Sequence, residues 1–219
     1  VLGLYYITKP RKSTPEHHVK GEGMRFYSAE EVNIAYNEKR IDLHAIINVK
    51  VDIQEDGKIV NKLIETTVGR VMFNQFVPKK YGYINELLTK KALRDIIGEI
   101  LKETSTDVCA QFLDDIKNLG FNMAFKGGLS FNLGNVNIPD EKKELVANAN
   151  IEVEEVLGNY NRGFITNNER YNQIIDIWTH ANSRLTNTLM KQLANDDQGF
   201  NPVYMMLDSG ARGSKQQIK

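Results

Sequence analysis

Apolar residues recur at intervals of three and four along the last third of the chain, which predicts long helices. The strongest run consists of Tyr171, Ile174, Ile175, Trp178, Ala181, Leu185 and Leu189. Thr166 precedes this run and Glu169 follows three residues later, which is the capping-box pattern of a helix start. An earlier helical stretch opens at Pro139, a residue suited to a first turn, and extends to about Tyr160. The short segment between the two stretches predicts an antiparallel helical hairpin at about 139–195.

The middle of the chain carries two further helical patterns. One face of the first holds Leu93, Ile96, Ile97, Ile100 and Leu101, and one face of the second holds Val108, Phe112, Ile116 and Leu119. Gly120 is placed to cap the second helix at its C-terminus. The stretch "FNMAFKGGLSFNLGNVNIP" then mixes aromatic residues with Gly and Asn, which predicts a packed irregular loop.

Strand signals lie ahead of these helices. Alternating apolar and polar residues on both sides of an "EDG" turn predict an antiparallel β unit from about Leu43 to Phe76, ended by Pro78. Before it, Ser28 and Glu31 form a capping-box pattern that predicts a short surface helix. A small antiparallel β unit followed by helices and a long hairpin makes an α+β fold.

Charge and composition argue against some classes of function. The chain has 28 basic and 28 acidic residues, which argues against a wholly basic nucleic-acid-binding module but not against a local anion site. Cys109 is the only cysteine and no apolar run approaches the roughly 20 residues that span a bilayer, so we expect a cytoplasmic protein without membrane contact. Because the first residue is Val1 inside an apolar phrase and Lys219 ends a polar one, we expect a fragment of a longer polypeptide.

The residue types that usually carry metal or acid–base chemistry are scattered. They are His17, His18, His44 and His180, and the carboxylate pairs Asp114–Asp115 and Asp196–Asp197. None has the spacing of a zinc or magnesium site, and the acids are expected on helix surfaces or in loops. We expect Cys109 to be a small core residue rather than a nucleophile.

One C-terminal phrase places an arginine among small residues. In "SGARGS", Arg212 has Gly210 and Gly213 close by, with Ser209 and Ser214 at the ends. The guanidinium can bind phosphate with two hydrogen bonds, and glycines permit a ligand to approach closely. Alternatively, the arginine bonds carbonyls at a helix end and the glycines serve the turn. The residues alone leave both interpretations open.

The first hairpin helix has a marked excess of acid. It carries Asp140, Glu141, Glu144, Glu152, Glu154 and Glu155 against Lys142 and Lys143. Such a face is most often simply solvated, but it is also suited to docking a basic partner. A stand-alone hairpin that binds another protein is therefore an alternative function.

Ordered motifs throughout the chain resemble one known family. "NPVYMMLDSGARGSKQQI" is preceded, in order, by "VLGLYYIT", "GEGM", "TTVGRVMFN", "GFNMAFKGGLSF", "GFIT" with "ERYN", and "IDIW". This series resembles the β′ subunit of bacterial DNA-dependent RNA polymerase over essentially the whole length. The resemblance implies transcription, a nucleotidyltransferase that acts on DNA and RNA, and the β, α, ω and σ subunits as partners. It also implies that catalytic Mg²⁺ is held by residues outside this chain, so that the fragment binds no cofactor and is inactive alone.

The resemblance further implies where each region lies. Residues 1–126 would form the pore region of the secondary channel, through which nucleoside triphosphates enter and backtracked RNA leaves. Residues 127–219 would form the funnel region, with the hairpin as the rim helices on which coiled-coil regulators of the Gre and DksA kind dock. Many family members carry Asp-Asp-Met where this chain has Gly134-Asn135-Val136, so any role of those acids is not carried over.

Three residues take expected roles from the same resemblance. Arg212 would contact the phosphates of the incoming nucleotide, and Met206 would shape the wall of the nucleotide path. Arg70 would belong either to the pore wall or to a structural ion pair. A small independent phosphate-binding enzyme is a weaker alternative, because no general base or metal site accompanies Arg212.

Overall fold

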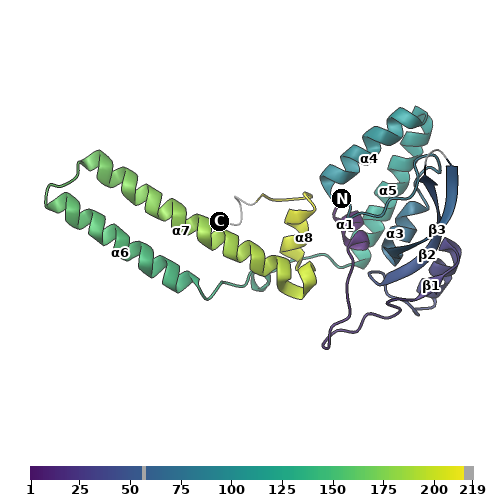
Figure 1. Ribbon diagram of the computed structural model, residues 1–219, viewed down its shortest axis with the longest axis horizontal. Coiled ribbons are helices and arrows are strands. Elements are labelled where there is room, and N and C mark those ends of the chain that lie inside the picture. The colour runs from purple at the N-terminus through teal and green to yellow at the C-terminus, as the bar shows by residue number, and fades with distance from the viewer. Residues whose placement is uncertain (56–57, 215–219) are drawn as a thin grey trace. The chain divides into compact units, whose positions relative to one another are not determined.

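The computed structural model describes residues 1–55 and 58–214 and confirms the α+β fold (Figure 1). The helices are α1 (Leu2–Thr8), α2 (Ala29–Asn37), α3 (Val68–Asn74), α4 (Lys90–Glu103), α5 (Thr106–Lys126), α6 (Lys142–Asn161), α7 (Asn167–Asn195) and α8 (Pro202–Asp208), with 3₁₀ turns η1 (Leu133–Asn135) and η2 (Asp196–Gly199). The strands are β1 (Arg25–Phe26), β2 (Ile46–Glu55) and β3 (Lys58–Thr67). In the described part of the chain, no helix is both long enough and apolar enough to cross a membrane.

The chain forms two compact units. The first comprises residues 1–130 and 205–212, so a short segment near the C-terminus packs with the N-terminal part. The second comprises residues 131–204 and, within the described residues, Gly213 and Ser214. The assignment of 1–126 to a pore and 127–219 to a funnel stays a prediction.

The sheet of the first unit confirms the central β prediction and corrects its end. Strands β2 and β3 pair antiparallel from Ile46 opposite Thr67 to Glu55 opposite Lys58, and β1 adds a short parallel edge that the sequence pattern did not predict. Residues 56 and 57 of the expected "EDG" turn lie outside the described residues. The expected strand beyond residue 67 is wrong, because 68–74 form α3.

The start of α3 explains this correction. The hydroxyl of Thr67 accepts a hydrogen bond from the backbone nitrogen of Arg70 and so caps the helix. Val68, Val71 and Phe73 then point into the core at helical spacing. At Gly69, an added Cβ would lie 1.9 Å from the carbonyl oxygen of Ile7, so this close approach of α3 to α1 requires glycine.

Helix α5 is longer than the sequence pattern predicted. It continues from Thr106 through Gly120 to Lys126, so Gly120 is not a C-cap and part of the expected irregular loop is helical. The reason is tertiary packing: a Cβ on Gly3 of α1 would lie 1.9 Å from the carbonyl oxygen of Gly120. Because Gly3 has no Cβ, the α1 backbone can approach the Gly120 carbonyl closely, and this packing outweighs the low helix propensity of Gly120.

Two apolar clusters form the core of the first unit. One joins α1, α3, α4 and α5, with Phe73 and Phe112 packed edge to face at 6.4 Å between ring centroids. The other lies between the sheet, α2 and α3. Cys109 is buried in the first cluster, as expected for a core residue, whereas Val108 and Leu101 are exposed.

The second unit contains the predicted antiparallel hairpin of α6 and α7 (Figure 1). Its capping box is confirmed, because Thr166 accepts from the Glu169 nitrogen and Glu169 binds the Thr166 nitrogen. Helix α6 begins at Lys142 rather than at Pro139, whose carbonyl accepts from the Lys142 nitrogen in a preceding turn. The start was placed too early because proline fits such a turn as well as a helix.

Candidate functional site

The small residues around Arg212 form a tight turn after α8. Ser209 is fully buried, and its hydroxyl donates to the Met206 carbonyl at 3.2 Å and accepts from the Ala211 nitrogen at 3.3 Å. The Arg212 nitrogen also donates to the Met206 carbonyl, at 3.3 Å. Gly210 has a φ of +71°, a left-handed conformation that glycine adopts at little cost. The sequence "SGAR" therefore encodes a local hydrogen-bonded turn.

The Arg212 side chain itself projects from this turn. It is exposed, and within residues 1–55 and 58–214 its guanidinium makes no hydrogen bond or ion pair. The carbonyl at the end of α8 is already bonded by the Arg212 backbone nitrogen and by Ser209. The side chain thus has its five N–H donors available for an anion.

Contacts across the first unit hold the turn in place. Tyr5 of α1 is completely buried, and its hydroxyl donates to the Asp208 carboxylate at 2.6 Å. The Lys9 ammonium donates to the Tyr5 hydroxyl at 3.2 Å. Burial lowers the pKa of Lys9, and the nearby Asp208 carboxylate partly opposes this shift. This chain of polar groups ties the end of α8 to α1.

A backbone hydrogen bond also fixes the turn to the start of α4. The Lys90 nitrogen donates to the Ser209 carbonyl at 2.8 Å, one residue after the Thr89 cap of that helix. A Cβ on Gly210 would lie 3.2 Å from the Lys90 Cβ, which leaves little room for any larger residue. The turn is therefore fixed on one side by α1 and on another by α4.

Arg70 has a different environment from Arg212. Its Nε donates to the Thr8 carbonyl at 3.0 Å, and its Nη1 donates to the carbonyl and side-chain oxygens of Asn85 at 3.2 and 3.0 Å. Burial lowers the pKa of Arg70, while Tyr83 and Glu86 favour its charged form. These bonds go to uncharged oxygens, so they link α1, α3 and the loop before α4 without a directly bonded carboxylate. A contribution of Arg70 to a pore wall stays a prediction.

The three predicted site residues all lie in the first unit. Arg212 and Met206 share a backbone hydrogen bond, and Met206 is half-buried on α8. Arg70 contacts the C-terminal end of α1, whereas Asp208 contacts its middle. Helix α1 is thus the common support of Arg70 and of the Arg212 turn.

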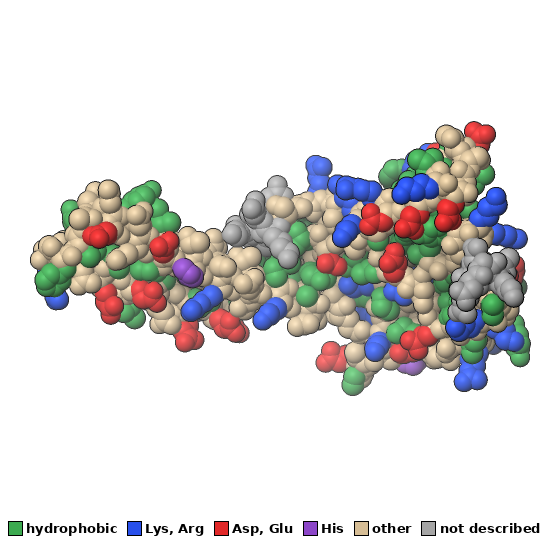
Figure 2. All heavy atoms as spheres, turned by 45° about the horizontal axis from the view of Figure 1, so that its top comes forward, with side chains coloured by type: hydrophobic (Ala, Val, Ile, Leu, Met, Phe, Trp, Pro, Cys, Tyr) green, Lys and Arg blue, Asp and Glu red, His purple; other side chains and the backbone are tan. Residues whose placement is uncertain are grey.

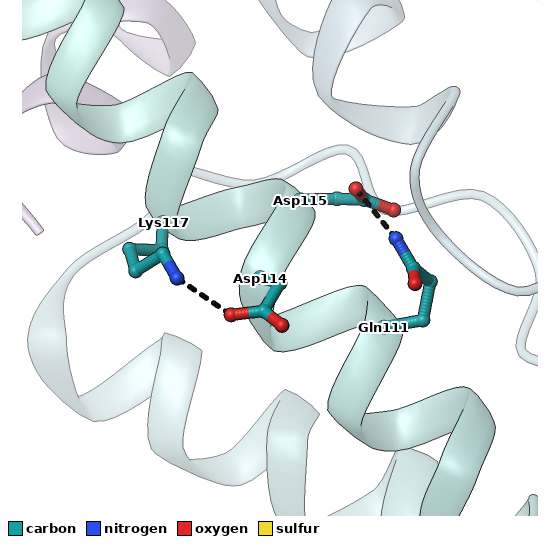
Figure 3. Close-up of polar contacts among 4 residues, drawn as sticks. All are labelled: Gln111, Asp114, Asp115 and Lys117. Carbon is teal, nitrogen blue, oxygen red and sulfur yellow. Dashed lines mark hydrogen bonds and ion pairs between the residues drawn. The ribbon is translucent and has the colours of Figure 1, made fainter.

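The candidate carboxylates Asp114 and Asp115 have separate partners on α5. On α5, Asp114 bonds Lys117 at 2.6 Å and Asp115 bonds Gln111 at 3.0 Å, so each has its own partner on the same helix (Figure 3). All four residues of these contacts lie on a surface where such pairs contribute only tenths of a kcal/mol. Across the part of the chain that the structure describes, no three His, Cys, Asp or Glu residues are grouped to hold a metal.

The hairpin exposes many of the apolar residues that the sequence pattern placed on one face. Only Ala149 of α6 and Leu193 of α7 are buried among the described hairpin residues. The larger exposed ones are Ile151, Leu157, Phe164, Tyr171, Ile175 and Trp178. In the space-filling view, hydrophobic and acidic side chains both lie on the visible surface of the hairpin (Figure 2).

Comparison with known proteins identifies the family. The model described as "RNA polymerase Rpb1, domain 3" matches residues 1–136, and "RNA polymerase Rpb1, domain 4" matches residues 165–219. The chain belongs to the RNA polymerase Rpb1 family. This result confirms the resemblance read from the ordered motifs.

Curated relatives in this family are similar along the whole chain. DNA-directed RNA polymerase subunit beta' of Parabacteroides distasonis is 63% identical over 220 residues, that of Bacteroides thetaiotaomicron 60%, and that of Flavobacterium psychrophilum 58%. In each case all of this chain is covered, but the chain spans only 15% of the relative's length.

Some residues that support Arg70 and the turn around Arg212 in this Rpb1-family chain were not singled out from the sequence. The bond between Tyr5 and Asp208 joins residues 203 positions apart, and the Arg70 contacts to Thr8 and Asn85 join three separate segments. Tyr5 lies in an apolar phrase, and nothing in its neighbours indicates a carboxylate partner.

Proposed function

We propose that this chain is a segment of the β′ subunit of DNA-directed RNA polymerase and takes part in DNA-templated RNA synthesis. The observation that carries the proposal is identity of 57–63% with polymerase β′ subunits over the full chain. The other polymerase subunits, DNA, RNA and nucleoside triphosphates are then its partners, and the whole enzyme acts in the cytoplasm. A hairpin-only function would leave unexplained the family match over residues 1–136.

A chimeric subunit tests this proposal. Residues 1–219 would replace the matching segment of the full-length Parabacteroides distasonis β′ subunit, which is 63% identical there. The assembled enzyme should transcribe a DNA template at close to the rate of the parent. Failure of a well-assembled chimera to synthesise RNA would contradict the proposal.

Within the enzyme, we assign residues 1–126 to the wall of the secondary channel and Arg212 to the phosphates of the incoming nucleotide. Support comes from the exposed guanidinium on a turn that two internal contacts hold in place. A fixed cation can neutralise phosphate charge and orient the leaving pyrophosphate without a large loss of entropy. Met206, on α8 just before this turn, would shape the path rather than bond to the substrate.

The catalytic chemistry would come from elsewhere in the subunit. Two-metal nucleotidyl transfer needs carboxylates that hold Mg²⁺, and the described residues of this chain offer no such cluster. The segment by itself is therefore proposed to be inactive, with substrate positioning as its contribution.

The hairpin of α6 and α7 is proposed to dock coiled-coil regulators at the mouth of the channel. Its exposed apolar residues and its acidic excess on α6 support this role. The paired changes Phe164→Ser and Trp178→Ser should weaken binding of a Gre-type factor to the assembled enzyme, while basal transcription persists. Unchanged factor affinity would contradict the docking role without affecting the chimera test.

A further inference from the structure

A cavity in the first unit is lined by basic side chains that the proposed function does not use. The cavity has a volume of about 620 Å³ and lies between the loop after α1, the end of α2 and the segment before β2. Its cationic and histidine lining consists of Arg11, His17, His18, Lys20, Lys39, His44 and Lys126. Asp42 is the only carboxylate among the residues that line it.

Three lysines contribute exposed positive charge to this cavity. Asp42 uses one carboxylate oxygen to accept from the Lys20 backbone nitrogen at 2.7 Å. Among the described residues, the ammonium groups of Lys20, Lys39 and Lys126 make no ion pair. The chain as a whole has equal numbers of acids and bases, so this is a local concentration of positive charge. Cations gathered in a concave surface focus their field, and a bound anion would relieve their repulsion.

Lys39 is held in an unusual backbone conformation at the rim. Its φ is +58°, in the left-handed region that glycine often occupies at helix C-termini. It follows α2, and its nitrogen donates to the Tyr36 carbonyl at 2.9 Å in the turn that ends the helix. A lysine here costs conformational free energy that glycine would not. This conformation belongs to the end of the helix, and it makes Lys39→Gly a substitution that the backbone tolerates.

The cavity has a volume and an aromatic lining that suit a small molecule. Tyr6 and Tyr36 line the cavity, and Tyr6 packs edge to face with His44 at 4.5 Å between ring centroids. The volume falls within the range of about 300–1,000 Å³ that small-ligand pockets occupy and exceeds the need of a single inorganic ion.

We propose that this cavity binds a small compound carrying several phosphate groups, with Lys20, Lys39 and Lys126 neutralising its charge. Pyrophosphate and a nucleoside triphosphate share this chemistry and are the two sources to be separated. The site involves none of the contacts around Arg212, so it stands independently of the proposed role of that residue.

The test uses the intact subunit assembled into polymerase. Binding of pyrophosphate and of adenosine triphosphate would be measured by calorimetry in the presence of a chelator, so that a magnesium-dependent centre stays empty. The variants are Lys39→Gly and Lys20→Gln, with Lys102→Gln at an exposed position of α4 as the control for loss of one lysine. Lys39→Gly is the informative change because it removes the ammonium while relieving backbone strain, so the fold should not lose stability.

We expect one site whose affinity falls about tenfold in Lys39→Gly and in Lys20→Gln but is unchanged in Lys102→Gln. If both pyrophosphate and the nucleotide bind, the site recognises phosphate groups alone. If the nucleotide binds and pyrophosphate does not, the aromatic wall of the cavity also contributes contacts. Absence of binding, or equal affinity in Lys39→Gly and the parent, overturns the proposal. Binding of single-stranded RNA but of neither small compound also overturns it.

Discussion

The first unit and the hairpin bury their hydrophobic residues to very different extents. In the first unit Phe112 is 1% exposed and Phe73 fully buried, whereas in the hairpin Trp178 is 39% and Phe164 72% exposed. Large apolar side chains stabilise a fold in proportion to the area that they remove from water. The first unit is therefore stabilised by its own core, and the hairpin by contacts between two helices, which leaves much of its apolar surface available to a partner.

Truncation of one aromatic residue to alanine in each region tests this contrast and has the largest expected effect. Phe112→Ala should lower the free energy of unfolding of the first unit by about 3–5 kcal/mol, because it empties a site packed against Phe73. Trp178→Ala should cost less than about 1 kcal/mol, as expected near the surface. Urea unfolding of each variant followed by circular dichroism measures both values. Similar losses at the two positions would show that the hairpin is packed as well as the core.

A buried histidine makes the first unit sensitive to acid. Burial lowers the pKa of His44 to about 4 from an ordinary value of 6.5, and the ring contacts the Lys9 carbonyl through Nδ1 at 3.1 Å. Between these two pKa values the unfolded chain binds more protons than the folded chain. The contribution of neutral His44 to the free energy of unfolding should therefore be fully present above about pH 6.5. It should fall by up to about 3 kcal/mol as the pH approaches 4.

The His44 contribution can be separated from that of the carboxylates by substitution. His44→Asn keeps a donor near the position of Nδ1 and removes the titrating ring, so the difference in stability between parent and variant should shrink as the pH falls from 6.5 to 4. His180→Asn, at an exposed position on α7, is the matched control for loss of one imidazole outside the core. A difference in stability between parent and His44→Asn that stays constant over this pH range would contradict a buried, neutral His44.

The smallest of these effects concerns the start of α7. Thr166→Ala removes the hydroxyl that accepts from the Glu169 nitrogen and should destabilise the hairpin by about 1 kcal/mol. Amide hydrogen exchange should speed up in the first turn of α7 and stay unchanged in α4 and α5. Faster exchange throughout the first unit would mean that the two regions unfold together.

Local patterns predicted the elements that depend on neighbouring residues. The capping box at Thr166, the antiparallel pairing of β2 with β3 and the helices around residues 90–126 follow from periodicity and cap chemistry. The Ser28 cap is confirmed too, although the Glu31 carboxylate binds the nitrogen of Tyr27 instead of the cap nitrogen.

Elements that depend on distant residues were not predictable in the same way. Gly120 reads as a helix end, and only the crossing with Gly3 shows why the helix continues. Residues 68–74 have strand-like composition, but burial of one face against α1 and the Thr67 cap make them helical. The turn around Arg212 was visible as a motif, whereas its support by Tyr5 depends on a contact across 203 positions.

The central claim is that the first unit presents Arg212 to the nucleotide phosphates. We would assemble polymerase with Arg212→Ala, with Arg25→Ala at the exposed position of β1 as the control for loss of one arginine, and measure single-nucleotide addition against triphosphate concentration. The account predicts that Arg212→Ala loses about 1–3 kcal/mol of transition-state stabilisation and that the control is unaffected. Unchanged nucleotide addition in well-assembled Arg212→Ala enzyme would contradict it.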